Sequence, residues 1–159
     1  AGRFAALLLF ASLCTNVLAQ PLLERAKTNV SSLQLVSDDI SEYVNEIFKK
    51  PETTDEESSL ADSLTRIQNW VIQTQRDMEA IQFSIQLYDL VGDERARARA
   101  RAILRLQSSF MHSRATTAVK MLELLGPRLS SSQLRVLSNR ALAPTKVALR
   151  LVTEIRDSY

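Results

Sequence analysis

Residues 60–88 decide the fold, and they read LADSLTRIQNWVIQTQRDMEAIQFSIQLY. In this stretch apolar side chains recur at alternating spacings of four and three residues, with one threonine among them. The members of this seam are Leu60, Leu64, Ile67, Val71, Thr74, Met78, Ile81, Ile85 and Tyr88. An average spacing of about 3.5 residues is typical of a helix that packs almost parallel to its neighbours. The pattern predicts a helix over about residues 59–91, roughly 50 Å long at about 1.5 Å per residue.

Segments on either side of the seam have helical patterns of similar length. A helix is predicted over about residues 22–49, because Pro51 lacks the N–H that would continue it. The acidic residues 51–57 are expected to form a link to the seam helix. Another helix is predicted from residue 93 or 94 to the pair Gly126-Pro127, an order typical of a helix C-terminus. Its inward positions are expected to be Ala96, Ala100, Ile103, Gln107, Met111, Ala115, Ala118, Leu122 and Leu125.

A last helix is predicted after Ser130–Ser132. Its inward side chains are expected to be Leu134, Leu137, Ala141, Ala148, Val152 and Ile155. Pro144 either kinks this helix or begins a separate segment. Because short links join long helices, we expect an all-α fold, an elongated antiparallel up-down-up-down four-helix bundle with its fourth helix kinked or split at Pro144. Residues 20–159 would form this single domain, which is large enough to bury its own core.

The first 19 residues have the layout of a secretory signal peptide. The basic Arg3 precedes an apolar run over residues 4–13, and small residues precede a cut between Ala19 and Gln20. The run is too short to span a bilayer, which takes about 20 apolar residues. We therefore expect a secreted, extracellular protein without a transmembrane segment, which after processing would lack the single cysteine of the chain.

The formal net charge of +2 conceals an asymmetry between two halves. Residues 20–94 carry 6 basic and 15 acidic side chains, a net charge of −9, whereas residues 95–159 carry 13 basic and 3 acidic ones, a net charge of +10. The simpler interpretation is that the halves attract each other within one bundle. The alternative is that the basic half presents a face to an anionic polymer, an anionic lipid or an acidic partner.

The basic half begins with an unusual arginine-rich segment. It contains Arg95, Arg97, Arg99, Arg101 and Arg105. On a helix, Arg95 and Arg99 lie on one flank, with Arg97 and Arg101 roughly opposite. The simpler interpretation is a solvated stretch whose arginines pair with the acidic residues of segment 89–94 and of the first two helices. The alternative is a polyanion site, although not one for nucleic acid, because aromatic residues are not interleaved and no known motif is present.

A second apolar row lies on the seam helix, on the face opposite the seam. It consists of Ile72, Phe83, Leu87 and Leu90. That face of a four-helix bundle meets solvent, so apolar surface there predicts contact with a protein partner or with a second copy of the chain. The alternative is that the segment after Pro144 covers the row.

The triplet Asn29-Val30-Ser31 is an acceptor for N-glycosylation in a secreted protein. A glycan at Asn29 would require that side of the first helix to be open to solvent. We therefore predict Asn29 as a candidate glycosylation site.

Motifs that carry chemistry are sparse. The sequence has no phosphate-binding loop, nucleophile elbow or catalytic triad, and its single histidine makes no metal set with a cysteine. We expect no cofactor, no metal and no enzymatic activity, and instead a secreted helical bundle that binds a macromolecular partner. The alternative is an extracellular carrier of lipid or another small apolar ligand. Ser37, Thr74 and Gln107 could line a cavity for that ligand, or hydrogen-bond within an ordinary core.

Overall fold

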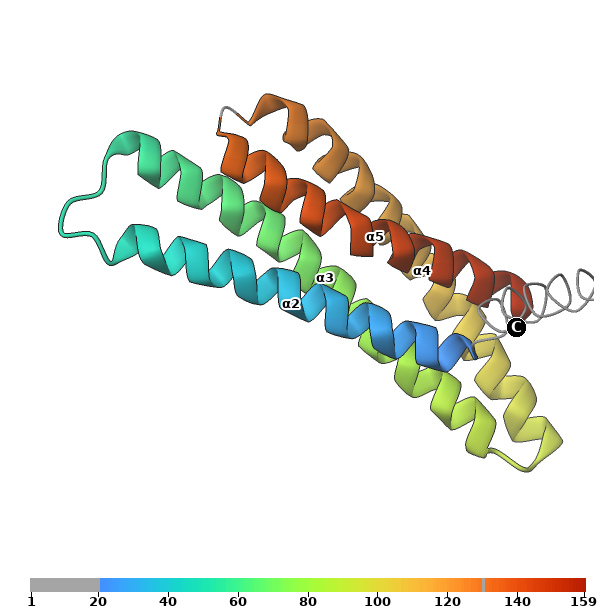
Figure 1. The fold of residues 1–159 in the computed structure, drawn as a ribbon. Coiled ribbons are helices and arrows are strands. Elements are labelled where there is room, and N and C mark those ends of the chain that lie inside the picture. Colours follow the sequence, from blue (N-terminus) through green and yellow to red (C-terminus); the bar gives the residue numbers. More distant parts are fainter. Residues whose placement is uncertain (1–20, 130) are drawn as a thin grey trace, which may run out of the picture.

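Four long helices form one bundle in the computed structural model, which describes residues 21–129 and 131–159 (Figure 1). They are α2 (Leu22–Phe48), α3 (Asp55–Leu90), α4 (Glu94–Leu125) and α5 (Ser132–Ser158), with the 3-10 turn η1 (Gly126–Arg128) between the last two. Helices α2 and α4 each pack against α3 and α5, and α3 also contacts α5 across the bundle. Successive helices run antiparallel, and the described residues contain no strand. The predicted all-α up-down-up-down bundle is confirmed.

The seam of α3 lies at the centre of the core, as the spacing predicts. Leu64, Ile67, Val71 and Ile81 are completely buried, and the hydroxyl-bearing Thr74 is only 5% exposed. Around them pack apolar side chains from the other three helices. They include Leu33 and Ile40 from α2, Leu104 and Leu122 from α4, and Leu151 and Ile155 from α5.

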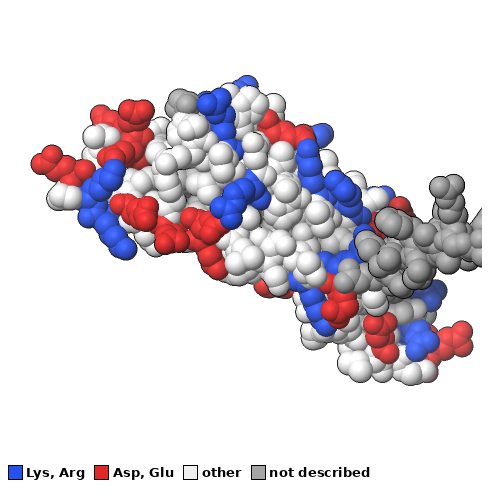
Figure 2. All heavy atoms as spheres, in the orientation of Figure 1, with Lys and Arg blue, Asp and Glu red and all other residues white. Residues whose placement is uncertain are grey.

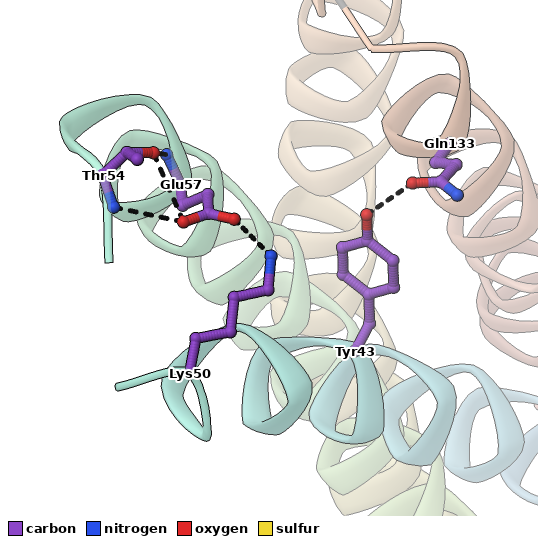
Figure 3. A network of polar contacts seen from close by, with 5 residues as sticks. All are labelled: Tyr43, Lys50, Thr54, Glu57 and Gln133. Carbon is purple, nitrogen blue, oxygen red and sulfur yellow. Dashed lines mark hydrogen bonds and ion pairs between the residues drawn. The ribbon is translucent and has the colours of Figure 1, made fainter. Parts of the chain in front are cut away.

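Helix α3 begins at Asp55, four residues earlier than the seam alone predicts. The Thr54 hydroxyl accepts a hydrogen bond from the Glu57 backbone N–H (3.2 Å), and the Glu57 carboxylate accepts one from the Thr54 backbone N–H (3.1 Å). This capping box satisfies two backbone donors at the helix start. Glu57 also forms an ion pair with Lys50 (Figure 3). The prediction of a link over residues 51–57 is therefore wrong for its last three residues.

Helix α4 starts as predicted, with Asp93 accepting a hydrogen bond from the Ala96 backbone N–H (2.8 Å). Its inward face differs from the prediction. Ile103 is 53% exposed, whereas its neighbour Leu104 and Ser108 are completely buried. Adjacent helical positions lie about 100° apart, so burial of Leu104 turns Ile103 outward.

The second half of α4 follows the prediction. Ala115 is 5% exposed, and Arg114 stays outside the core. Helix α5 continues through Pro144, which lies inside one unbroken helix and neither ends nor divides it.

Candidate binding surface

Two polar contacts show which sides of α3 and α4 face each other. The Ser84 hydroxyl donates a hydrogen bond to the side-chain oxygen of Gln107 (2.6 Å). The Arg114 guanidinium donates to both carboxylate oxygens of Asp77, through Nε (2.9 Å) and Nη2 (2.5 Å). These pairs mark the line along which the two antiparallel helices meet.

Apolar side chains project on the solvent side of this line. At about 100° per residue, Phe83, Leu87 and Leu90 lie on the side of Ser84 that faces away from the core. Positions 103, 106 and 110 lie on the corresponding side of Gln107. Both rows therefore share one surface, here called the outer face. Its members and their exposed fractions are Phe83 65%, Leu87 45%, Leu90 83%, Ile103 53%, Leu106 62% and Phe110 65%.

The outer face contains most of the predicted apolar row and extends it. Phe83, Leu87 and Leu90 are exposed, and the segment after Pro144 does not cover them. Ile72 is only partly exposed and lies three turns away along α3. The half of the face on α4 was not predicted from the sequence. The spacing of residues 103, 106 and 110 is a second apolar row of the same kind, which could have revealed it.

The arginines of the arginine-rich segment fall into two groups in the structure. The guanidinium groups of Arg97 and Arg101 lie 5.8 and 5.9 Å from the centre of the Tyr88 ring, and Arg101 also donates to the Tyr88 hydroxyl (3.0 Å). Tyr88 packs edge-on against Tyr159, with ring centres 4.9 Å apart. Burial raises the pKa of the Tyr159 phenol, and the negative charge of Asp89 adds to that shift. Arg97 and Arg101 therefore lie over the Tyr88 ring near the end of α3.

Arg95, Arg99 and Arg105 are exposed. Arg95 and Arg99 precede Ile103 by two turns and one turn of α4, so they continue the outer face toward the α3–α4 connection. Within the described ranges, none of the arginines at positions 95–105 forms a salt bridge. The expected pairing with acidic residues of segment 89–94 is wrong.

The acidic and basic halves of the chain do meet elsewhere in the bundle. Asp77 pairs with Arg114 between α3 and α4, and Asp39 pairs with Arg140 between α2 and α5. Figure 2 shows acidic residues gathered at the end of the bundle that holds the α2–α3 connection. The simpler interpretation of the charge asymmetry therefore accounts for some of the basic residues, but not for Arg95 and Arg99.

Asn29 is 3% exposed, on the side of α2 that packs against α5. Its Nδ2 atom, to which a glycan would be attached, donates a hydrogen bond to the Pro144 carbonyl oxygen (2.9 Å). A glycan at this atom and the observed packing are mutually exclusive. Glycosylation of Asn29 stays a prediction, now one that requires α2 and α5 to separate locally. The predicted cleavage site at Ala19 and Gln20 lies outside the described residues.

The polar members of the seams hydrogen-bond inside the bundle. The Gln68 side chain donates to the Ser37 carbonyl oxygen (3.2 Å), the Thr74 hydroxyl donates to the Trp70 carbonyl oxygen (2.8 Å), and Gln107 accepts from Ser84. A pocket of about 430 Å³ lies instead on the surface between α2 and α5. The Tyr43 hydroxyl donates to the side-chain oxygen of Gln133 there (2.5 Å; Figure 3).

In residues 21–129 and 131–159 no group of three or more histidine, cysteine, aspartate or glutamate side chains is placed to hold a metal ion. None of the described helices combines the length and apolar character needed to cross a bilayer. Comparison of the chain with protein-family models, with curated proteins and with solved structures finds no match. The function of the chain is therefore inferred from the surface of the bundle.

Proposed function

We propose that this chain is a secreted, non-enzymatic helical-bundle protein that binds a macromolecular partner through the outer face of the α3–α4 hairpin. One observation carries the proposal: six large apolar side chains, each at least 45% exposed, lie together on one surface formed by two helices. Contiguous apolar surface of more than a few hundred Å² is uncommon on soluble monomers and marks interaction sites. Binding would remove these side chains from water, which is the main favourable term in association.

The alternative function, as a carrier of a small apolar ligand, has weaker support. A groove of about 410 Å³ between α2 and α5 is lined by apolar residues such as Val147 and Leu151. However, the candidate cavity residues Ser37, Thr74 and Gln107 line none of the four best-defined pockets on the described residues.

Site-specific photo-crosslinking tests the proposed function. A photoreactive amino acid would replace Leu106 on the outer face or, as a matched control, Leu35 on α2. The two side chains are equally exposed, at 62% and 65%. In the extracellular fluid of the native source, we expect adducts with a macromolecule or a lipid assembly from position 106 and not from position 35. Equal adducts at both positions would contradict the proposal. N-terminal analysis of the released protein tests secretion, with Gln20 as the expected first residue.

A further inference from the structure

We infer that the partner of the outer face is an anionic lipid surface, on which the α3–α4 hairpin lies with its apolar side chains inserted. This inference rests on the proposed function, because it takes the outer face to be the binding surface. It adds the chemistry of the partner, which is argued below from shape, charge and position.

The shape of the outer face suits a lipid surface better than a peptide. A helical or extended peptide docks into a groove lined with apolar pockets. The four best-defined pockets on the described residues are lined by side chains outside the outer face. Its side chains project instead, with Leu90 83% exposed and both phenylalanines 65% exposed. Projecting leucine and phenylalanine side chains are what an interfacial helix inserts among lipid headgroups.

The charges around the outer face complement an anionic surface. Arg95 and Arg99 continue the apolar row of α4, are exposed, and form no salt bridge within the described residues. Asp89 and Glu94 are also exposed, and each lies about 100° around its helix from its chain neighbour, Leu90 or Arg95. Asp93 caps α4, and Glu79 accepts a hydrogen bond from Gln75 within α3. Arginine beside projecting apolar side chains is the pattern by which amphipathic helices bind anionic lipids.

The position of the outer face leaves room for a flat partner. In Figure 1 the end of the α3–α4 hairpin extends beyond the ends of α2 and α5. Leu90 is the last residue of α3, and Arg95 and Arg99 belong to the first two turns of α4, next to the connection that forms this end. A planar surface can therefore approach these residues without contacting α2 or α5.

Vesicle co-sedimentation of the full processed chain tests the inference. The probes are vesicles of phosphatidylcholine alone and of phosphatidylcholine mixed with phosphatidylserine in equal parts. We expect binding to the mixed vesicles only. The binding should weaken as NaCl is raised, because charges separated by more than about 8–10 Å are screened at physiological ionic strength.

Two pairs of variants assign the binding to the outer face. Leu106→Gln with Phe110→Gln should abolish binding, whereas Leu35→Gln with Val136→Gln, which changes equally exposed apolar side chains elsewhere, should not. Arg95→Gln with Arg99→Gln should weaken binding about thirtyfold, since each arginine near an anionic surface contributes about fivefold. Arg66→Gln with Arg135→Gln removes the same charge from other exposed positions and should change binding far less. Circular dichroism would confirm that every variant remains helical.

Several outcomes would overturn the inference. Equal binding to both kinds of vesicle, or unchanged binding by the outer-face variants, would exclude recognition of anionic lipid by this surface. A dimer that is lost in the Leu106 and Phe110 variant, without vesicle binding, would assign the face to a second copy of the chain. In that case, and where crosslinks at position 106 reach a protein, the proposed function would survive while the lipid inference failed. Equal crosslinking at positions 106 and 35 would contradict both the proposed function and the lipid inference.

Discussion

At the scale of single residues, neighbouring isoleucine and leucine side chains in α4 have opposite surroundings. Leu104 is completely buried and Ile103 is 53% exposed, although both are large and apolar. Sequence spacing predicted Ile103 as the inward one, because residues 96, 100 and 103 continue a regular seam. The contact of Gln107 with Ser84 fixes a different rotation of the helix.

The first prediction compares two isoleucines. Ile81 is completely buried in the core, so Ile81→Ala should lower the free energy of unfolding by about 2–5 kcal/mol. Ile103→Ala, on the outer face, should lower it by less than about 1 kcal/mol. Urea denaturation of both variants measures the difference. Equal losses would mean that the inward face of α4 is assigned incorrectly.

The second prediction concerns the buried carboxylate of Asp77, which is 7% exposed. Arg114→Gln would remove the cation that pairs with this carboxylate. The carboxylate would keep the hydrogen bond that it accepts from Gln73. The Arg114 side chain is half-exposed, so water can partly replace it. We expect a loss of about 1–3 kcal/mol, less than for a fully buried pair. Arg135→Gln, at an exposed position without a salt bridge in the described chain, is the control, and a similar loss there would refute the assignment.

At the scale of elements, the four helices differ in how far the sequence predicts them. The nine-member seam of α3 gives its inward face without error, because each member is strongly apolar or, at Thr74, hydrogen-bonded within the helix. Helix α4 begins with alternating arginine and alanine, which give a weak pattern, and its rotation depends on contacts with α3. The start of α3 had a local signal, the order Thr54-Asp-Glu-Glu57, which is that of a capping box.

The third prediction tests, by its pH dependence, the contribution of the negative charge of Glu57 in this capping box. The hydrogen bond from Lys50, followed by that from the Thr54 backbone, holds the pKa of Glu57 below its ordinary value of 4.5. A carboxyl group whose pKa is lower in the folded state stabilises the fold above its unfolded pKa. This contribution is lost as the pH falls through the folded pKa. Glu57→Gln should therefore be less stable than the parent protein at neutral pH.

The difference in unfolding free energy between the parent and Glu57→Gln should narrow as the pH is lowered from about 4.5. Glutamine can still accept the hydrogen bond from the Thr54 backbone, so the comparison isolates the charge. Glu56→Gln, an exposed change in the same turn, provides the control. A difference that stays constant from neutral to acid pH would contradict this account of Glu57.

At the scale of the whole molecule, the bundle presents two opposite apolar faces on α3, and the described residues cover one of them. The fold itself could be predicted from the lengths of the helices, their short links and the seam. The α3 half of the outer face was predicted, and the spacing of residues 103, 106 and 110 indicates the apolar row of its α4 half. That the two rows share one surface depends on which sides of the two helices meet. No pattern within a single helix contains that information.

The fourth prediction separates the two faces of α3. Phe83→Glu with Leu87→Lys should leave helicity and the melting temperature nearly unchanged, because both side chains already meet solvent. Ile81→Glu with Ile85→Lys, which places the same charges in the core, should unfold the protein. Circular dichroism melting curves distinguish the two. A collapse of the Phe83 and Leu87 variant would show that the outer face belongs to the core.

The order of the helices also has a consequence for the rate of folding. Each helix packs against the next one in the chain, whereas α5 also contacts α3 across the bundle and α2, and the contact of α2 with α5 closes the ring. Such local topologies fold in about microseconds to milliseconds, and we expect the distant contact to form last. Leu151→Ala, in the groove between α2 and α5, should therefore speed unfolding and leave the folding rate almost unchanged in stopped-flow measurements. The lifetime of the native bundle would then depend on the rate at which α2 separates from α5.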